Sequence, residues 1–324
     1  MNEPMVVVGG YGYGNVGDEA MLAGLVAKYA GHRLTVVSRN PPRTAALHGV
    51  AAVPIGAAMP ALMTHRSVLI GGGSLFGRDM GRIGRMLPAF GRVARLLRRD
   101  VVLDGIGLDD VDPASAGVRR LLSAASSVTV RDGRSLELAR SWGVAAELDA
   151  DLSVHMPQMD DSVGRELLRG AGVDLRRQVV GLCLTGVDVA LGGLMVEAAA
   201  AAMERMPGVE FVFIPMGRHP TVRTHDDLVL GRELQRRQPR LHLLETDGHP
   251  AGVLSSFRFL DAAVCMRFHS LVFAERTGTP IIPIAYASKC ATWLDERRMA
   301  SVEPLVPQLH AALAGLLGAE RRAG

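Results

Sequence analysis

Short apolar runs alternate with amphipathic segments along the whole chain. The runs are rich in β-branched residues, and most of them end in a glycine or polar loop. This alternation predicts an α/β fold of parallel sheets with helices on both faces. In the first half we expect strands at Met5–Val8, Leu34–Val37, Ser67–Ile70, Val101–Leu103 and Ser127–Val130. In the second half we expect strands at Val179–Leu184, Val209–Ile214, Leu241–Leu244, Ala262–Cys265 and Pro280–Ile284.

The pattern is interrupted at residues 152–178, which carry many charges, Pro157 and few strand signals. A chain of 324 residues is long enough for two domains, each with its own core. We therefore expect an N-terminal Rossmann-like domain at 1–155, a connection at 156–178 with a helix around 162–170, and a C-terminal Rossmann-like domain at 179–303. The expected arrangement is two domains facing across a cleft. A closing helix at 304–318 is expected to join the N-terminal domain.

A glycine-rich turn, Gly9 to Glu19, follows the first strand, and residues 12–17 spell the dinucleotide fingerprint G-x-G-x-x-G. In a dinucleotide enzyme the pyrophosphate lies on the helix N-terminus, which favours an anion. Asp18 and Glu19 already place two negative charges there, so the loop favours a neutral ligand that bears hydroxyl groups. The second strand also lacks the following acid that binds a ribose. Arg39 at its end could meet a 2′-phosphate, which leaves an NADP enzyme as an alternative.

Composition narrows the class of protein further. No apolar run reaches the roughly 18–20 residues of a membrane span. The first residues lack the features of a signal peptide, so we expect a cytoplasmic protein. The odd set Cys183, Cys265 and Cys290 sits in apolar stretches, which indicates buried, reduced thiols. A formal charge of +3 with 4% aromatic residues gives no sign of nucleic-acid stacking.

The segment 78–99 is basic because it holds seven arginines: Arg78, Arg82, Arg85, Arg92, Arg95, Arg98 and Arg99. We favour a solvated helix face as its explanation. The alternative is peripheral contact with anionic lipid headgroups, or with an undecaprenyl-type phosphate, at the inner face of a membrane. The oligomeric state is not predicted.

Arg267 and His269 lie between a buried strand that ends at Met266 and a segment whose helical spacing begins at Ser270. Alternation puts both side chains on one side of an extended chain. A helix N-terminus disfavours imidazolium, so His269 is expected to be neutral and able to accept a proton. Arg267 offers a planar fork for a carboxylate or phosphate. Functional roles are favoured over a helix cap and an ordinary ion pair, because strand ends collect active-site residues.

Two other cations follow predicted strands. Arg131 comes after Val130, and anion binding is one of its two plausible roles, the other being structural. The chain has two lysines, Lys28 and Lys289, against thirty-four arginines. Lys28 is expected in solvent. Lys289 lies on the expected ligand-binding edge of a sheet and either holds a phosphate oxygen or is an exposed loop lysine.

The loop Gly71-Gly72-Gly73-Ser74 lets backbone N–H groups approach a ligand but lacks the Gly-Lys-Ser/Thr ending of a P-loop, so nucleotide hydrolysis is not indicated. Asp104 is expected to form a turn. No metal site is expected from the loop residues His219, His225, Asp226 and Asp227.

Several blocks, in order, resemble the polysaccharide pyruvyl transferases and span nearly the whole chain. They are Val7 to Ala20, Gly71-Gly72-Gly73-Ser74-Leu75-Phe76, Thr129-Val130-Arg131-Asp132, Asp149-Ala150-Asp151, Met266-Arg267-Phe268-His269-Ser270, and Tyr286 with Lys289. One departure is Leu152-Ser153, where a proline often follows the acid in relatives. The resemblance implies a fold similar to the GT-B glycosyltransferases. It also implies transfer of a pyruvyl group from phosphoenolpyruvate to a sugar, often as a ketal, with release of phosphate.

The resemblance and the chemistry together assign expected roles to individual residues. Phosphoenolpyruvate is the co-substrate, and no further cofactor or metal is expected; the acceptor is a free, lipid-linked or polymeric saccharide. His269, Arg267 and Arg131 are the expected catalytic residues, with Asp18 or Glu19 as partner to His269. Donor binding is expected from Arg131, Arg267, Lys289 and Ser270. Acceptor binding is expected from Tyr11, Tyr13, Asn15, Asp18, Glu19, Gly73 and Ser74.

Two other functions remain open at this point. One is a GT-B glycosyltransferase that uses a nucleotide-sugar donor, with His219 and Asp226 as weak candidates for base and ribose contacts. The other is a sugar- or anion-binding regulatory protein that has lost the chemistry, although the pairs Arg267-His269 and Asp18-Glu19 argue against it.

Overall fold

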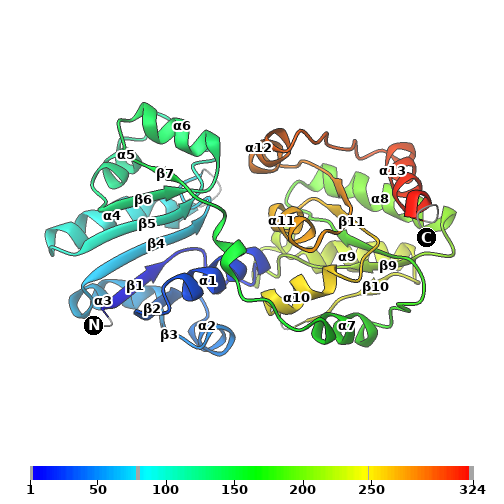
Figure 1. The fold of residues 1–324 in the computed structure, drawn as a ribbon, viewed down its shortest axis with the longest axis horizontal. Helices are drawn as coiled ribbons and strands as arrows, with labels where there is room; N and C mark the ends of the chain where they lie inside the picture. The colour runs from blue at the N-terminus through cyan, green and yellow to red at the C-terminus, as the bar shows by residue number, and fades with distance from the viewer. Residues whose placement is uncertain (1–2, 78–80, 247, 321–324) are drawn as a thin grey trace. The chain divides into compact units, whose positions relative to one another are not determined.

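The computed structural model describes residues 3–77, 81–246 and 248–320. The chain forms two compact units. The first contains residues up to Tyr13 and from Asp18 to Pro157, and the second contains Gly14–Gly17 and the chain from Gln158 onward. Each unit is built on one parallel sheet with helices on both faces, so the predicted fold class is confirmed (Figure 1).

The first unit has a seven-stranded sheet in the order β3-β2-β1-β4-β5-β6-β7. Its strands are β1 (Pro4–Val8), β2 (Arg33–Ser38), β3 (Ala51–Pro54), β4 (Ser67–Gly73), β5 (Asp100–Ile106), β6 (Ser127–Val130) and β7 (Glu147–Leu148). Its helices are α1 (Val16–Lys28, whose first two residues count with the second unit), α2 (Pro41–His48), α3 (Ala58–Thr64), α4 (Gly81–Leu96), α5 (Ala116–Ser123) and α6 (Gly133–Ser141). Short 3₁₀ turns lie at Ile55–Ala57 and Leu152–His155.

Alternation along β1 divides this core into two layers. Met5 and Val7 pack with Leu22 and Leu25 of α1 on one face. Val6 and Val8 point to the other face, where their cluster includes residues of α3, α4, α5 and α6. The order of the strands reverses beside β1, between β1 and β4. Ligands of such sheets bind beyond the carboxyl ends of the strands at this point.

The second unit repeats the same winding with five strands, in the order β10-β9-β8-β11-β12. Its strands are β8 (Val179–Cys183), β9 (Glu210–Phe213), β10 (His242–Leu243), β11 (Ala262–Cys265) and β12 (Ile281–Pro283). Its helices are α7 (Asp161–Gly170), α8 (Val189–Arg205), α9 (Asp227–Arg237), α10 (Pro250–Phe257), α11 (Phe268–Thr277), α12 (Ser288–Glu296) and α13 (Val306–Glu320), with a 3₁₀ turn at Arg223–His225. Here the order reverses between β8 and β11, so the loops after these strands are the expected ligand loops.

Helix α13 packs in the second unit, which differs from the expectation that this helix joins the N-terminal domain. Leu309, Leu313 and Leu317 are buried in the same cluster as Met195 and Met203 of α8. Helix α7, expected within the connection, also belongs to the second unit. The close packing of α7 on α10 explains this, since a Cβ on Gly164 would meet the backbone of Ser255.

All ten expected strands are present, with small changes at their ends. The strands β4 and β5 run on to Gly73 and Ile106, into segments expected to be loops. Strands β3 and β7 lie at the sheet edges and were not expected. Arg78 lies outside the described residues, and so do the side chains of Arg82 and Arg85.

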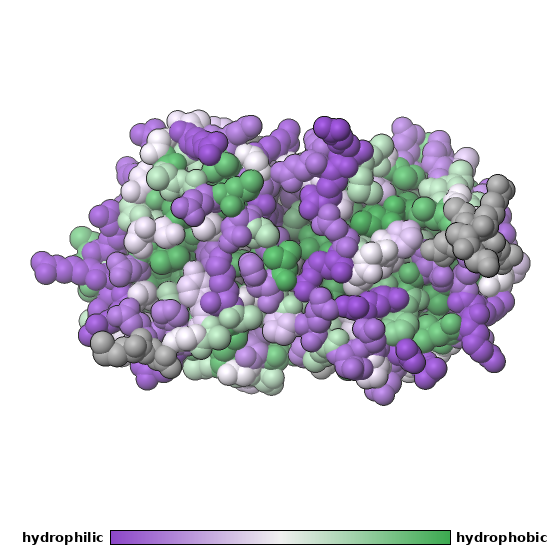
Figure 2. Space-filling model, in the orientation of Figure 1, coloured by the Kyte–Doolittle hydropathy of each residue, from purple (hydrophilic) through white to green (hydrophobic). Residues whose placement is uncertain are grey.

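The three cysteines are free and buried, as expected. Among the described residues, no helix combines the length and the apolar character that crossing a membrane requires. On the face shown in Figure 2, hydrophilic side chains are spread over each unit with hydrophobic surface between them.

Candidate functional site

The second half of the glycine-rich turn lies against the loop that follows β9. Asn15 forms an isolated antiparallel bridge with Gly217. The backbone N–H of Val16 donates to the carbonyl oxygen of Met216 at 2.8 Å, and that of Arg218 donates to the carbonyl oxygen of Gly14 at 2.9 Å. This pairing makes Gly14–Gly17 part of the second unit, although the chain on either side belongs to the first.

Gly17 packs against the ring of His269. A Cβ on Gly17 would lie less than 3.0 Å from three atoms of the imidazole, including Nδ1, so no other residue fits without moving the ring. The Gly17 N–H donates to the side-chain oxygen of Asn15 at 2.9 Å, which fixes the turn. The structure therefore brings together two segments that the sequence separates by about 250 residues, and both were expected to be functional.

Arg267 and His269 begin α11 at the end of β11, where the sequence placed them. Arg267 is the N-cap residue in an extended conformation, and His269 lies in the first turn, 9% exposed. The hydroxyl of Ser270 donates to the Arg267 carbonyl at 2.5 Å, and Ser270 is fully buried. Donor binding by Ser270 is therefore not supported by its position; the residue fixes the start of the helix.

A buried ion pair holds Arg267 in place. Its Nη2 donates to the Asp227 carboxylate at 2.6 Å and its Nε donates at 3.1 Å, while Asp227 is completely buried. Burial disfavours the charged guanidinium, but Asp227 outweighs that effect and Tyr286 adds to it, so the pKa of Arg267 lies above its ordinary value. Arg267 thus keeps its charge, and its fork is already shared with a carboxylate.

Lys289 lies half-buried in the first turn of α12. This helix follows β12, which pairs with β11, and the thiol of Cys290 donates to the Met266 carbonyl at 3.4 Å. The starts of α11 and α12 are therefore neighbours. Within the part of the chain that the structure describes, Lys289 forms no ion pair. A cation at a helix N-terminus interacts unfavourably with the helix dipole, so an anion bound there would stabilise both the Lys289 ammonium and the helix.

Arg131 lies in the first unit, and its side chain is only 3% exposed. Its Nη2 donates to Asp109 at 2.7 Å and to the Ser74 hydroxyl at 2.8 Å, and Nη1 donates to Asp151 at 3.4 Å. Burial opposes its charge, yet Asp109, Asp151 and Asp132 raise the pKa of Arg131 above its ordinary value. With three carboxylates around it, Arg131 has the environment of a structural cation.

Tyr11 and Glu19, expected to bind the acceptor, are buried at 1% exposure each. The Tyr11 hydroxyl donates to the Gly71 carbonyl at 2.7 Å, and burial together with nearby carboxylates raises the pKa of Tyr11. Glu19 accepts from the Gly12 N–H at 2.9 Å through one oxygen and pairs with His48 at 2.8 Å through the other. These contacts hold the turn to the sheet, so neither position supports a role at the acceptor.

The other expected acceptor residues are more accessible. Tyr13, Asn15, Asp18 and Ser74 are half-buried, while Gly73 is buried at the end of β4. The Asp18 carboxylate lies beside Gly10, 3.3 Å from the position of a Cβ there, and close to Gly73. In the first unit, Asp18 and the end of β4 therefore lie together beyond the carboxyl ends of β1 and β4.

Lys28 and Asp104 also differ from expectation. The Lys28 ammonium donates to Asp104 at 3.0 Å and to Asp149 at 2.8 Å, and these contacts raise the pKa of Lys28 although partial burial opposes this. Asp104 lies within β5, 1% exposed, and also accepts from Thr129 at 2.6 Å. Lys28 is thus a structural cation rather than a solvated one.

Sequence reasoning missed the partners of the two arginines. Asp227 stands at the start of α9 and was considered only as a metal ligand, and Asp109 follows β5. An acid that follows a strand, such as Asp109, or that begins a helix, such as Asp227, is the signal that could have found these partners. No group of three or more His, Cys, Asp or Glu side chains within the described ranges is placed to hold a metal ion.

The environment of Arg131 predicts a large effect of its removal on stability. Replacing Arg131 with Met leaves Asp109 and Asp151 buried without their cation, which typically costs about 3–5 kcal/mol. We expect a clearly lower denaturation midpoint by circular dichroism for R131M. The matched control is R140M, since Arg140 is exposed on α6 and forms no ion pair among the described residues. Equal midpoints for R131M and R140M would contradict the structural role.

Solved structures similar to this chain share its fold. UDP-GlcNAc 2-epimerase from Neisseria meningitidis matches with a TM-score of 0.67 and 11% identity, over 99% of this chain and 92% of that one. The enzyme of the same name from Methanocaldococcus jannaschii gives 0.67 and 11%, over 97% and 92%. E. coli ADP-heptose LPS heptosyltransferase II gives 0.56 and 12%, over 98% and 99%. These are GT-B proteins, and the likeness shows that the chain has this fold.

No curated protein matches the chain by sequence. The family described as polysaccharide pyruvyl transferase, however, matches residues 15–288, which is most of the chain. The match includes the second half of the glycine-rich turn and the Arg267-His269 segment that the structure brings against it. The chain belongs to the polysaccharide pyruvyl transferase family.

Proposed function

We propose that this protein transfers a pyruvyl group from phosphoenolpyruvate to a sugar of a polysaccharide or of its precursor, forming a ketal and releasing phosphate. The observation that carries the proposal is the contact of Gly17 with His269, beside Arg267 and near the start of α12. Family membership makes the protein a transferase acting on polysaccharide, and the donor and the mechanism are our inference.

Phosphoenolpyruvate carries two anionic groups, a carboxylate and a phosphate, so its binding requires cationic side chains. Of the three cations expected to do this, Arg131 is enclosed by carboxylates and Arg267 shares its fork with Asp227. Lys289 is the cation whose charge no carboxylate of the described residues offsets. We therefore assign the donor phosphate to Lys289 and the N-terminus of α12, with Arg267 supplying a permanent positive charge beside them.

His269 is the proposed acid–base group. The methylene carbon of the enol phosphate takes a proton, and the resulting oxocarbenium carbon is attacked by a sugar hydroxyl, which gives up its own proton. A second hydroxyl of the sugar then attacks the same carbon: the C–O bond to phosphate breaks, the ketal closes, and the proton of that hydroxyl leaves with the phosphate. A residue that accepts one proton and delivers another suits an imidazole, and Gly17 is what allows the ring of His269 to lie where it does.

A carboxylate is the proposed partner on the acceptor side. Glu19 uses both oxygens within the first unit, on Gly12 and His48. Asp18 is half-buried and follows Gly17 directly in the chain. We therefore assign to Asp18 rather than Glu19 the role of receiving a proton from the sugar hydroxyl.

The direct test uses purified protein, phosphoenolpyruvate and a panel of saccharide acceptors. We expect release of inorganic phosphate and a mass gain on one acceptor that matches a pyruvyl ketal. H269A should abolish turnover and leave donor binding, measured by calorimetry, largely unchanged. A parallel panel of nucleotide sugars serves as the competing assay: turnover there, with none on phosphoenolpyruvate, would replace the proposal with a glycosyltransferase.

The contact between Gly17 and His269 predicts that one methyl group at Gly17 stops the reaction. G17A forces the imidazole away from its position, so we expect kcat to fall by at least about a hundredfold, as 1 Å displacements do. G31A is the control, since a Cβ on Gly31 meets nothing within 4 Å. The far-ultraviolet spectrum should be unchanged in both. Normal turnover of G17A would show that catalysis does not require His269 in its observed position.

Because Lys289 forms no ion pair among the described residues, its replacement is expected to cause a defect specific to the donor. K289M should raise KM for phosphoenolpyruvate at least tenfold and leave KM for the acceptor within twofold, because a hydrogen bond to a charged group contributes about 1.5–3 kcal/mol. K289R, which keeps the charge, should fall between K289M and the wild type. If K289M changes the two KM values alike, Lys289 is not the phosphate ligand.

A further inference from the structure

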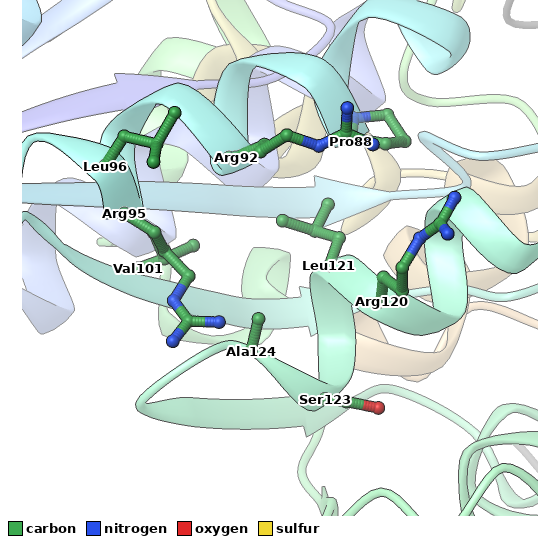
Figure 3. Close-up of a pocket in the computed structure, with 11 residues that line it drawn as sticks. Pro88, Arg92, Arg95, Leu96, Val101, Arg120, Leu121, Ser123 and Ala124 are labelled. Atoms are coloured by element: carbon green, nitrogen blue, oxygen red, sulfur yellow. The ribbon is translucent and has the colours of Figure 1, made fainter.

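A groove of about 470 Å³ lies on the first unit between α4 and α5. Leu96, Val101 and Leu121 line it together with the arginines Arg92, Arg95 and Arg120. Figure 3 shows the three arginine side chains reaching out around Leu121 from the two helices. The lining therefore combines an apolar floor with three cations, and the proposed reaction uses none of these residues.

The charge of this groove is not balanced locally. Arg92, Arg95 and Arg120 are exposed, and none of them forms an ion pair with any residue that the structure describes. Neither α4 nor α5 carries an acidic residue. Arg98 and Arg119 add further exposed positive charge at the same helices, so the surface attracts an anion.

Apolar side chains are exposed beside these arginines. Leu96 is 77% exposed and Met86 is 58% exposed on α4, and Met63 is 63% exposed at the end of α3. Arg99 donates to the Leu62 and Met63 carbonyls at 3.1 and 3.2 Å, which fixes the end of α4 beside α3. At the left edge of Figure 2, where Figure 1 shows an end of α4, a hydrophilic side chain projects beside hydrophobic surface.

The exposed apolar side chains are concentrated in this part of the chain. Among the described residues, five of the eleven exposed large hydrophobic side chains fall within residues 55–96: Ile55, Met59, Met63, Met86 and Leu96. Met63 and Leu96 lie at the ends of α3 and α4 that Arg99 joins, and exposed apolar groups that lie together in this way mark a surface that meets a partner. Arginines beside them can keep their charged ends in a polar layer while their stems cover apolar surface.

We propose that the α4–α5 groove docks the protein on an anionic phospholipid bilayer, with a lipid phosphate between Arg92, Arg95 and Arg120. Leu96 and the neighbouring methionines meet the acyl boundary. A nucleic acid would use aromatic side chains for stacking, and the groove lining contains none. An acidic peptide would satisfy the arginines but leave Leu96 and Met63 exposed. A bilayer satisfies both the charges and the apolar side chains.

Sedimentation with vesicles tests this docking with the full chain. We expect binding to vesicles of phosphatidylcholine with 30 mol % phosphatidylglycerol, little binding to phosphatidylcholine alone, and loss of binding in high salt. The triple variant R92Q/R95Q/R120Q should bind at least tenfold more weakly. L96S, which removes an exposed apolar group, should weaken binding several-fold without changing the salt dependence.

The matched control removes three exposed arginines elsewhere, R140Q/R169Q/R205Q, and therefore has the same net charge as the triple variant. We expect it to bind the anionic vesicles like the wild type. Equal weakening of the two triple variants would show attraction by net charge alone and overturn the proposal. So would full retention of binding in R92Q/R95Q/R120Q, or displacement from vesicles by 10 mM inorganic phosphate or by polyglutamate at matched ionic strength. Turnover of a soluble acceptor should be the same in all these variants. The result on vesicle binding is therefore independent of the result on the proposed activity.

Discussion

The missing side chain at Gly17 is the constraint on which the candidate site depends. Because Gly17 has no Cβ, the ring of His269 can lie against the backbone of a turn that begins in the first unit. The bridge of Asn15 to Gly217 and the bonds of Val16 and Arg218 hold that turn in register. The local geometry of His269 is thus set by two loops and a helix start, which is the kind of support that a catalytic group requires.

The number of carboxylates around each cation is our criterion for assigning it to the fold or to the proposed donor site. Arg131 and Lys28 each contact more than one carboxylate, and both serve the packing of the first unit. Arg267 is intermediate, because it is charged and paired but stands beside His269. Lys289 is uncompensated among the described residues. A strand-end position alone therefore does not indicate anion binding, because the carboxylates around a cation also bear on its role.

The fold was predictable from sequence to the extent that burial imposes a pattern. Strands buried on both faces, such as Ala262–Cys265, are found at the expected residues because a short, continuous apolar run is typical of a central strand in a parallel sheet. The edge strands β3 and β7 contain no buried residue, so their sequences lack that signal, and they were missed. The unit in which α13 packs and the burial of Tyr11 both depend on contacts between residues far apart in the sequence. Local periodicity does not report such contacts. The same limit applies to Arg131, whose partners Asp109 and Asp151 local periodicity did not reveal.

The glycines of the turn Gly9 to Glu19 make room for other parts of the protein, whereas the G-x-G-x-x-G pattern suggests that they make room for a pyrophosphate. In a dinucleotide site the glycines admit a pyrophosphate and pack helix on strand. Here the position of a Cβ on Gly12 is filled by Ser38 and the backbone of Asn40, that on Gly14 by the backbone of Arg218, and that on Gly17 by His269. All three glycines admit protein atoms. Since protein atoms occupy the turn, we propose that the donor anion binds elsewhere, at Arg267 and Lys289 where α11 and α12 begin.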